Sequence, residues 1–327
     1  MSTARLRTGR RWAAAVTTAS ALLLASTGVA SAQTATLDTA DEAAALIAQV
    51  APDAGEVLTL DVAADGSLTA NLDDGDLFVP SDGDAPVVLV STDFPNAETT
   101  PVSLNLPEDV GGAPAQVAAD GTVYYEGTDS VDVAIQGLDD GVRIQMVLAD
   151  ASAPSVFDFP LGEGLTPVKN ADGSVSLLAP TGDPNITNEV GVIQAPWAVD
   201  ANGVTVPTAL DVVGTTVVQT VAHTAGGVTY PVVADPKVSY GWGVYYHYSR
   251  AETKTIAGFG TGGVAVASAL CVPFGGAVGA TVCGIYAGSI VYHAGVAENS
   301  SPKRCLLIRM VHPSLLVPST YRDYRCV

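Results

Sequence analysis

The chain has few cysteines, few aromatic residues and few cations, and each shortage narrows what it can be. Only 4 of 327 residues are cysteine, 6% are aromatic, and 14 lysines and arginines face 34 acidic residues, for a net charge of −20. Such a chain is repelled by nucleic acid, so we expect no nucleic-acid partner. There is no C-x-x-C and the histidines are scattered, so we expect no metal site.

Known catalytic motifs are also missing. The sequence contains no G-x-S-x-G, H-E-x-x-H, P-loop or dinucleotide glycine fingerprint. The histidines are the only candidates for a general base: His223, His247, His293 and His312. His223 lies in a β-like run near Asp211, but no serine is placed beside it by the sequence. We therefore predict a protein that is not an enzyme and has no catalytic residues and no cofactor.

The N-terminal segment has the pattern of an export signal. Four arginines precede position 12, an apolar run follows at 12–29, and Ala-Ser-Ala stands at 30–32. A basic head, a short apolar body and small residues before the cut are typical of a secretory signal peptide. We predict cleavage after Ala32 and a secreted, extracellular protein. An N-terminal membrane anchor is the alternative.

Charge divides the rest of the chain into two parts. Residues 33–240 hold 31 acidic and three basic residues, a charge of −28. Residues 241–327 hold three acidic and seven basic residues, a charge of +4. This asymmetry predicts two modules. We place a signal peptide at 1–32, an acidic module at 33–236 and a basic module at 237–327.

The acidic module begins with one helix and continues as β structure. Thr39 can cap a helix that Pro52 ends, with Glu42 three residues after the cap. Short runs then alternate apolar and polar residues, as half-buried strands do. Between them stand turn dipeptides at Asp65-Gly66, Asp74-Gly75, Asp82-Gly83, Asp120-Gly121, Asp140-Gly141, Asp172-Gly173 and Asn202-Gly203. An antiparallel sandwich or meander follows, so the fold class is α+β and mainly β. The Asp-rich loop at 72–76 lacks the spacing of a calcium loop, and calcium remains the lesser alternative there.

The basic module predicts a helical hairpin followed by a strand. Ser249 and Glu252 form a capping box, so a helix should begin at Arg250 and end near Val272, because Pro273 cannot lie inside it. A second helix is expected over 277–297 and a strand over 304–312. Apart from His293, no residue from 255 to 297 can carry a charge.

All four cysteines fall in the basic module. In an exported chain an even number of cysteines in one short region indicates two disulfides. Four cysteines allow three pairings, and proximity favours Cys271 with Cys283 and Cys305 with Cys326. The first bond would close the bend of the hairpin.

Small residues along the hairpin favour close helix contact. Gly275 with Gly279, and Gly284 with Gly288, are G-x-x-x-G pairs. The apolar residues of one arm provide only about −2 to −4 kcal/mol of insertion free energy. A tightly packed hairpin in water and a membrane-active hairpin both remain open.

An aromatic stretch precedes the hairpin. It contains Tyr240, Trp242, Tyr245 and Tyr246. Aromatic rings next to cations are typical of a membrane-interface anchor and also of an edge strand that covers a core.

Two resemblances bear on the second half of the chain. PWAVDANGVTVPT at 196–208, TYPVVADP at 229–236 and the cysteine-containing Gly/Ala segment resemble a family of actinobacterial secreted proteins with a Y-P-V-x-A-D-P junction. That family is functionally uncharacterised and implies no catalytic residues. YGWGV at 240–244 is similar to the Y-G-N-G-V box of pediocin-like antimicrobial peptides, but Trp242 replaces the asparagine and the cysteine pair after the box is absent.

Together these patterns predict a secreted, non-enzymatic protein. Its basic module is expected to act as an effector on a membrane or a cell-surface component, as antimicrobial proteins do, while the acidic module keeps it in solution or masks it. The alternative is a structural or adhesive cell-envelope protein without membrane activity.

Overall fold

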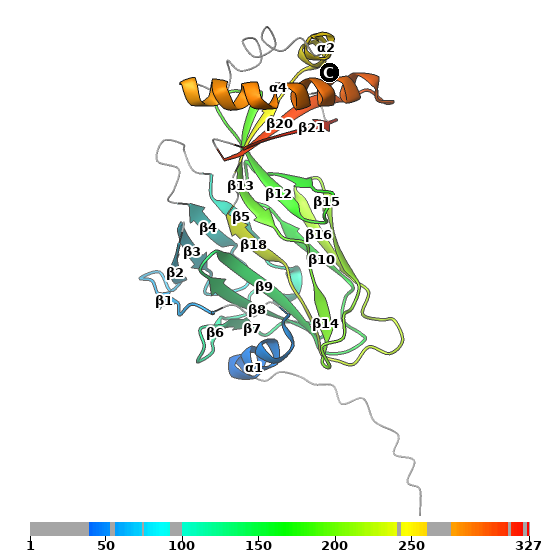
Figure 1. The fold of residues 1–327 in the computed structure, drawn as a ribbon. Helices are drawn as coiled ribbons and strands as arrows, with labels where there is room; N and C mark the ends of the chain where they lie inside the picture. Colours follow the sequence, from blue (N-terminus) through cyan, green and yellow to red (C-terminus); the bar gives the residue numbers. More distant parts are fainter. Residues whose placement is uncertain are drawn as a thin grey trace, which may run out of the picture. The chain divides into compact units, whose positions relative to one another are not determined.

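The computed structural model describes residues 39–52, 56–73, 75–91, 100–240, 243–259, 276–312, 315–322 and 326. These residues belong to one compact unit, Thr34–Val327. The predicted signal peptide lies outside the described residues. Strands outweigh helices, and every described strand pair is antiparallel (Figure 1). The predicted α+β, mainly β fold is therefore confirmed.

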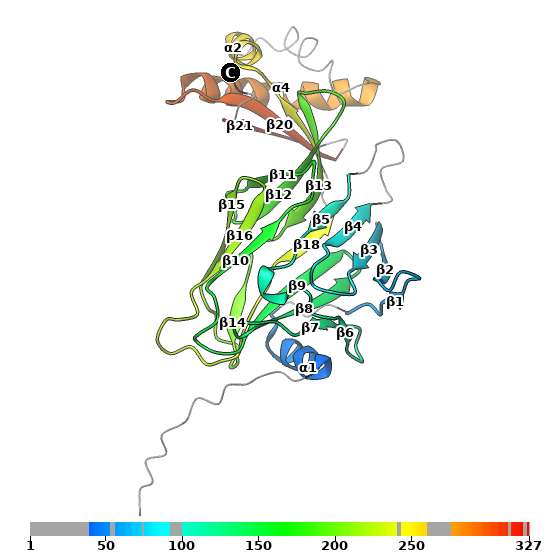
Figure 2. The same cartoon turned by 180° about the vertical axis from the view of Figure 1, so that it is seen from behind.

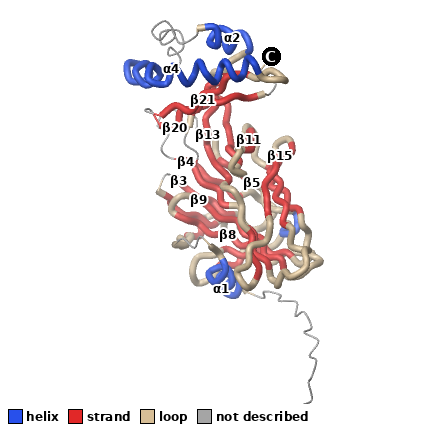
Figure 3. Tube along the Cα trace, turned by 45° about the vertical axis from the view of Figure 1, so that its right-hand side comes forward, coloured by secondary structure: helices blue, strands red, loops and turns tan. Residues whose placement is uncertain are grey.

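Within the described ranges the helical segments are few (Figure 3). They are α1 (Ala40–Val50), the 3-10 turn η1 (Glu108–Val110), α2 (Arg250–Gly258) and α4 (Gly276–Asn299). Helix α1 is the one predicted from its cap: the Glu42 amide donates to Thr39 Oγ1 at 3.3 Å, and the helix ends before Pro52. Its alanine- and isoleucine-bearing face packs on Ala134, Val147 and Tyr124.

The strands form three sheets. A five-stranded meander contains β1 (Asp61–Val62), β2 (Leu68–Leu72), β3 (Gly75–Val79), β4 (Val87–Ser91) and β5 (Val102–Leu104). A three-stranded sheet contains β10 (Val156–Pro160), β15 (Thr208–Val213) and β16 (Thr216–Val221). The main sheet contains β6 (Gln116–Val117), β7 (Val123–Tyr125), β8 (Val131–Leu138), β9 (Gly141–Leu148), β11 (Thr166–Lys169), β12 (Val175–Pro180), β13 (Ile186–Ile193), β14 (Ala198–Asp200), β17 (Val232–Ala234), β18 (Lys237–Tyr240), β19 (Val244–His247), β20 (Cys305–His312) and β21 (Leu315–Tyr321).

The three sheets share one large hydrophobic cluster, the main core. It includes Leu89 of the meander, Phe159 of the three-stranded sheet and Ile144 of the main sheet, all buried. Alternation along the strands places these apolar side chains on the inner faces, as the period of two predicts. Figure 2 shows the three-stranded sheet and the meander beside the long central strands.

Turn chemistry agrees with most of the predicted hairpins. Five of the seven predicted glycines have positive φ, namely Gly66, Gly121, Gly141, Gly173 and Gly203. At three of these turns the aspartate before the glycine accepts from the amide two residues on: Asp65 from Ser67 and Asp172 from Ser174, each at 3.0 Å, and Asp120 from Thr122 at 2.9 Å. The other two also stand at turns but without a positive φ: Gly75 begins β3 directly after the β2–β3 turn, and Gly83 lies in the turn between β3 and β4.

The main sheet is continuous across the boundary predicted between 236 and 237. Strand β13 pairs with β18 through Ile193 and Val238 and then with β19 through Ile186 and Tyr246. Strand β18 also pairs with β9, and β19 leads on to β20 and β21. Strands of the basic module therefore lie in the same sheet as those of the acidic module. Independent folding of the two modules stays a prediction.

The basic module differs in part from its prediction. Helix α4 confirms the second helix, and β20 confirms the strand at 304–312. The described part of the first helix is only α2, with Phe259 as its C-cap. Residues 260–275, which contain Cys271 and Gly275, lie outside the described residues, so the hairpin bend stays a prediction. Strand β21 was not predicted.

Candidate functional site

Strands β19, β20 and β21 carry two different faces. Along β20, Leu306 and Ile308 are buried against α4. Leu307 and Arg309, which alternate with them along the strand, point to the opposite side. The same alternation separates Tyr246 from Tyr245 on β19. One face of this sheet therefore seats the helices, and the other lines a groove.

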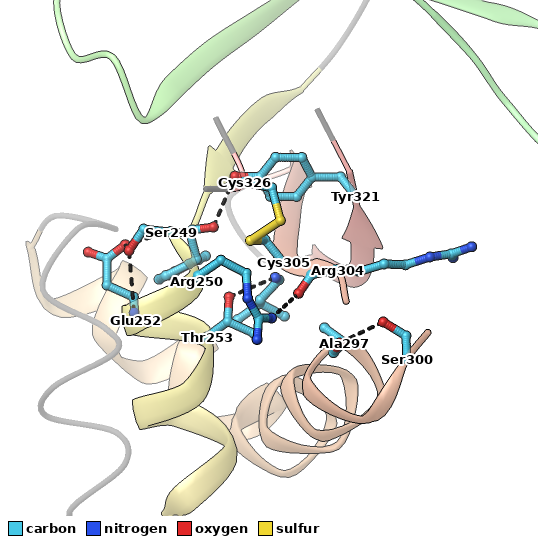
Figure 4. Close-up of a disulfide and its surroundings, with 12 residues drawn as sticks. Ser249, Arg250, Glu252, Thr253, Ala297, Ser300, Arg304, Cys305, Tyr321 and Cys326 are labelled. Atoms are coloured by element: carbon cyan, nitrogen blue, oxygen red, sulfur yellow. Dashed lines mark hydrogen bonds between the residues drawn. A yellow bond between two sulfur atoms is a disulfide. The ribbon is translucent and has the colours of Figure 1, made fainter. Parts of the chain in front are cut away.

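Helix α2 is fixed to the sheet by its first turn. Ser249 and Glu252 form the predicted capping box, which is confirmed by both of its hydrogen bonds. The buried Thr253 hydroxyl accepts from the Leu306 amide at 3.0 Å. Arg250 donates to the Arg304 carbonyl at 2.5 Å and to Glu298 at 2.6 Å. Figure 4 shows Ser249, Glu252, Arg250, Thr253 and Arg304 beside the disulfide.

Disulfide bonds cross-link the basic module. Cys305, at the start of β20, is bonded to Cys326, a sequence separation of 21, as predicted (Figure 4). The Tyr321 hydroxyl donates to the Tyr248 carbonyl at 2.9 Å near this bond. Cys283 is also disulfide-bonded, and its predicted partner Cys271 lies outside the described residues. None of the described cysteines is free.

Helix α4 has one buried and one exposed side. Ala287, Ile290 and Ala294 are buried against β20 and β21. On the other side Ile285 is 75%, Tyr292 67% and Val296 43% exposed. These three lie seven and four residues apart, so they share one side of the helix. Helix α4 thus presents an apolar surface, named here the α4 outer face.

Gly284 and Gly288 of α4 make no close contact with the described residues. Gly284 and Gly288 are exposed, and a Cβ at either would meet nothing within 4 Å. The predicted close packing at these two is therefore not found among the described residues, because they lie on the solvent side of the helix. Of Gly279 only the helical backbone is described.

The groove lies on the face of the sheet opposite α4. It has a volume of about 730 Å³ and is lined by side chains of β11 and the turn after it, β12, β19, β20 and β21. Strands β11 and β21 end the path β11-β12-β13-β19-β20-β21. These six strands must therefore curve, so that side chains from both ends line one concavity. We call it the β11–β21 groove.

A buried ion pair lies beneath this groove. Glu189 of β13 is fully buried and is paired with Arg309 of β20. The hydroxyls of Ser176 and Tyr245 both donate to its Oε1, at 2.6 and 2.9 Å. A buried carboxylate is tolerated only when it is paired and hydrogen-bonded, and here it has three donors. The network joins strands from both predicted modules.

Aromatic rings form the floor around this pair. The Arg309 guanidinium lies 5.5 Å from the centre of the Tyr245 ring. Tyr245 stacks on His247, with ring centres 6.5 Å apart, and His247 meets the edge of Tyr321 at 5.1 Å. The His247 ring is held by the Thr187 hydroxyl at 3.0 Å. Burial, reinforced by the Glu189 carboxylate, raises the pKa of Tyr245 to about 12.

A serine does lie beside His223, in another part of the molecule. Ser155 Oγ is 3.0 Å from His223 Nε2, and the Tyr230 hydroxyl is 2.9 Å from Nδ1. The same Nε2 is 3.1 Å from the Pro154 carbonyl, which can only accept, so Nε2 carries the proton. Ser155 then accepts from the imidazole instead of being activated by it. Burial lowers the pKa of His223. This geometry favours a structural role for the histidine.

Three of the four predicted interface aromatics lie in the described part of the chain. Tyr240, Tyr245 and Tyr246 are all buried. The Tyr240 ring belongs to the main core, and its hydroxyl donates toward the carbonyls of Asp76 and Val90. Their burial favours the alternative of strands that cover a core, and a membrane-interface role stays a prediction. Trp242 lies outside the described residues.

The comparisons with known proteins identify no relative. No protein-family model, no curated protein and no solved structure matches the chain. Among the described helices none is long and apolar enough to cross a bilayer. The described residues contain no cluster of His, Cys, Asp and Glu that could hold a metal ion.

Several residues of the groove were not singled out from the sequence. Lys169, Arg309 and Arg322 line it, and Glu189 lies beneath it. The available signal was a charged residue inside an otherwise apolar strand, as in ITNEVGVI and CLLIRMVH. That signal indicates that the charged side chain is buried, but it does not identify the residue that pairs with it.

Proposed function

We propose that this is an exported, non-enzymatic protein that binds reversibly to a lipid surface through the α4 outer face. The acidic β region, with most of the chain's negative charge, keeps it in solution. The likeness to actinobacterial secreted proteins and the export signal belong to this proposal. The observation that carries it is the exposure of Ile285, Tyr292 and Val296 on one side of a helix whose one acidic residue, Glu298, lies in its last turn.

The charge pattern of α4 supports a lipid partner. From 276 to 297 the helix has no acidic or basic residue except His293, and Lys303 and Arg304 follow it. Both are exposed; Lys303 is paired with Glu298 at 2.5 Å, and Arg304 adds a second positive charge. An apolar helix side next to cations is typical of helices that lie in the membrane interface.

The size of the surface favours lipid over a folded protein partner. A stable protein–protein interface buries at least about 1,200 Å² in total and contains well-packed anchor residues. The α4 outer face has three large side chains among glycine and serine. A bilayer needs no shape complementarity, so a narrow apolar stripe is sufficient.

The expected affinity is low. Complete burial of a large apolar side chain contributes about 1.5–3 kcal/mol, and these three are already partly covered, so about 3–5 kcal/mol is expected in total. A single myristoyl chain gives only marginal, reversible binding. The α4 outer face should behave similarly and attach the protein peripherally, without insertion.

Vesicle co-sedimentation tests the proposal. The chain from Gln33 would be mixed with phosphatidylcholine vesicles, with and without phosphatidylglycerol, and compared with Ile285→Gln/Tyr292→Gln/Val296→Gln. The variant should bind at least about tenfold more weakly, since the apolar contribution is removed. Trapped dye should stay inside the vesicles, because the helix does not insert.

A matched variant controls for nonspecific binding of exposed apolar side chains to the vesicles. Val62, Val156 and Val213 are exposed valines of the β region, and their triple glutamine variant should bind as the parent does. Equal binding of the α4 variant and the parent would reject the proposal. Equal loss in both triple variants would also reject it, because binding would then not depend on α4.

A structural or adhesive envelope protein is the second candidate. The continuous sheet and the Glu189–Arg309 pair favour it, because they tie both modules into one unit. Limited proteolysis separates the two ideas. A stable fragment released by a cut at 235–240 supports a separable effector, and uniform resistance supports a single structural unit.

A further inference from the structure

The β11–β21 groove differs in charge from the rest of the chain. Among the described residues its lining includes Lys169, Arg309 and Arg322 and no aspartate or glutamate, although the chain holds 34 acidic residues. The groove is therefore a cationic patch on an acidic protein.

Two of these cations are available to a ligand. The pair between Lys169 and Asp211 is long, at 3.6 Å, and both side chains are well exposed. Such pairs contribute little, so Lys169 can exchange Asp211 for another anion. Arg322 follows β21 and is exposed. Arg309 is neutralised by Glu189 and serves as floor, not as the principal anion contact.

The same groove has apolar walls. Val168 of β11 is 37% exposed and Val317 of β21 is 44% exposed, and both line it. Leu178 and Leu307 lie in the lining with them. Exposed valines at the two ends of a curved sheet leave apolar surface in water, which a ligand with an apolar body would cover.

We propose that the β11–β21 groove binds an aliphatic anion, that is, a carboxylate or phosphate carried on an alkyl chain. Lys169 and Arg322 hold the anionic group, and the alkyl chain lies between Val168 and Val317. The volume of about 730 Å³ is within the range of small-molecule sites. The site is distinct from the α4 outer face, which lies on the opposite side of β20.

Isothermal titration calorimetry with the chain from Gln33 tests this. Dodecanoate and dodecyl phosphate, both below their micelle concentrations, should bind at one site. Dodecyl maltoside has the same chain without charge, and inorganic phosphate has the charge without a chain, so each should bind at least about tenfold more weakly. If dodecyl maltoside binds equally well, or neither anion binds, the proposal is wrong.

Variants locate the site. Lys169→Gln/Arg322→Gln should weaken binding of both anions by at least about tenfold and remove its salt dependence. Lys254→Gln, an exposed cation of α2 outside the groove, is the matched control and should change nothing. An unchanged affinity in the double variant would overturn the proposal. Circular dichroism would verify that each variant is folded.

Two further comparisons complete the test. One identifies the class of the ligand, and the other distinguishes binding in the groove from binding at the α4 outer face. Dodecanoate stands for a free fatty acid and dodecyl phosphate for a phospholipid headgroup with its chain, and the tighter one identifies the class. The Ile285→Gln/Tyr292→Gln/Val296→Gln variant should bind both anions like the parent. If it loses them, the alkyl chain binds α4 and the groove assignment fails, whatever vesicle binding shows.

Discussion

The main core is filled by valine, leucine, isoleucine and phenylalanine from three sheets, whereas the cluster beneath α4 is filled partly by alanine and a half-cystine. The first has large side chains on every side. The second has a helix whose opposite side is exposed. A small cluster buries too little apolar surface to be stable alone. The C-terminal cluster is accordingly reinforced by a disulfide, a capping box and a buried ion pair.

The same isoleucine-to-alanine substitution in the two clusters should give the largest difference in the free energy of unfolding. Ile144 and Ile290 are both fully buried, in the main core and under α4 respectively. Ile144→Ala should lower the free energy of unfolding by about 4 kcal/mol, and Ile290→Ala by about 2 kcal/mol, because alanine neighbours at the edge can relax into the cavity. Urea denaturation followed by circular dichroism measures both. Equal losses would show that the two clusters are packed alike.

Removal of the disulfide should affect the C-terminal cluster alone. Cys305→Ser/Cys326→Ser opens a loop with a sequence separation of 21 and should cost about 3 kcal/mol on the loop-closure estimate. Hydrogen exchange should increase in α2, α4 and β21 while the amides of β8 and β9 stay protected. Faster exchange throughout the sheet would show that the clusters unfold as one.

Substitution of Glu189 measures how much the buried ion pair stabilises the contact between the two regions. Glu189→Gln keeps the shape of the side chain but leaves the partly exposed Arg309 without its counter-charge, and should cost about 2 kcal/mol. Asp211→Asn removes the exposed partner of Lys169 and should cost less than about 0.5 kcal/mol. Urea midpoints compare the two. If they agree, the buried network contributes no more than a surface pair.

Alkaline pH tests one tyrosine of the buried network. Tyr245 has its pKa raised to about 12, against an ordinary value of 10.0, so the folded state keeps a proton that the unfolded chain releases. Its contribution is complete below pH 10 and is lost as the pH rises from 10 toward 12. Tyr245→Phe should flatten the fall of the urea midpoint in that range. Tyr292→Phe, at an exposed position, should leave it unchanged.

Local patterns predicted local structure well. The cap at Thr39, the capping box at Ser249 and the strand beginning near Cys305 each depend on residues within a few positions of one another. Strand β21 was missed because Pro318 lies within it. The strand pairs only with β20 among the described strands, and a proline is tolerated at such an edge because its missing N–H is not needed there.

Contacts across long stretches of sequence could not be predicted. Glu189 and Arg309 are 120 positions apart, and nothing near either residue names the other. The charge change near 237 suggested a boundary between modules. Strand β13 pairs with β12 before it and with β18 and β19 after it, because pairing follows the register of the backbone and not the charge of the side chains.

The alternation along β20 limits how this region can change. Leu306 and Ile308 seat a helix while Leu307 and Arg309 line a groove. Insertion or deletion of one residue in this strand would exchange the two sets, placing a guanidinium under α4 and leucine in the cationic groove. The length of β20 is therefore fixed by two surfaces at once. Only substitution at alternate positions can alter one of them and spare the other.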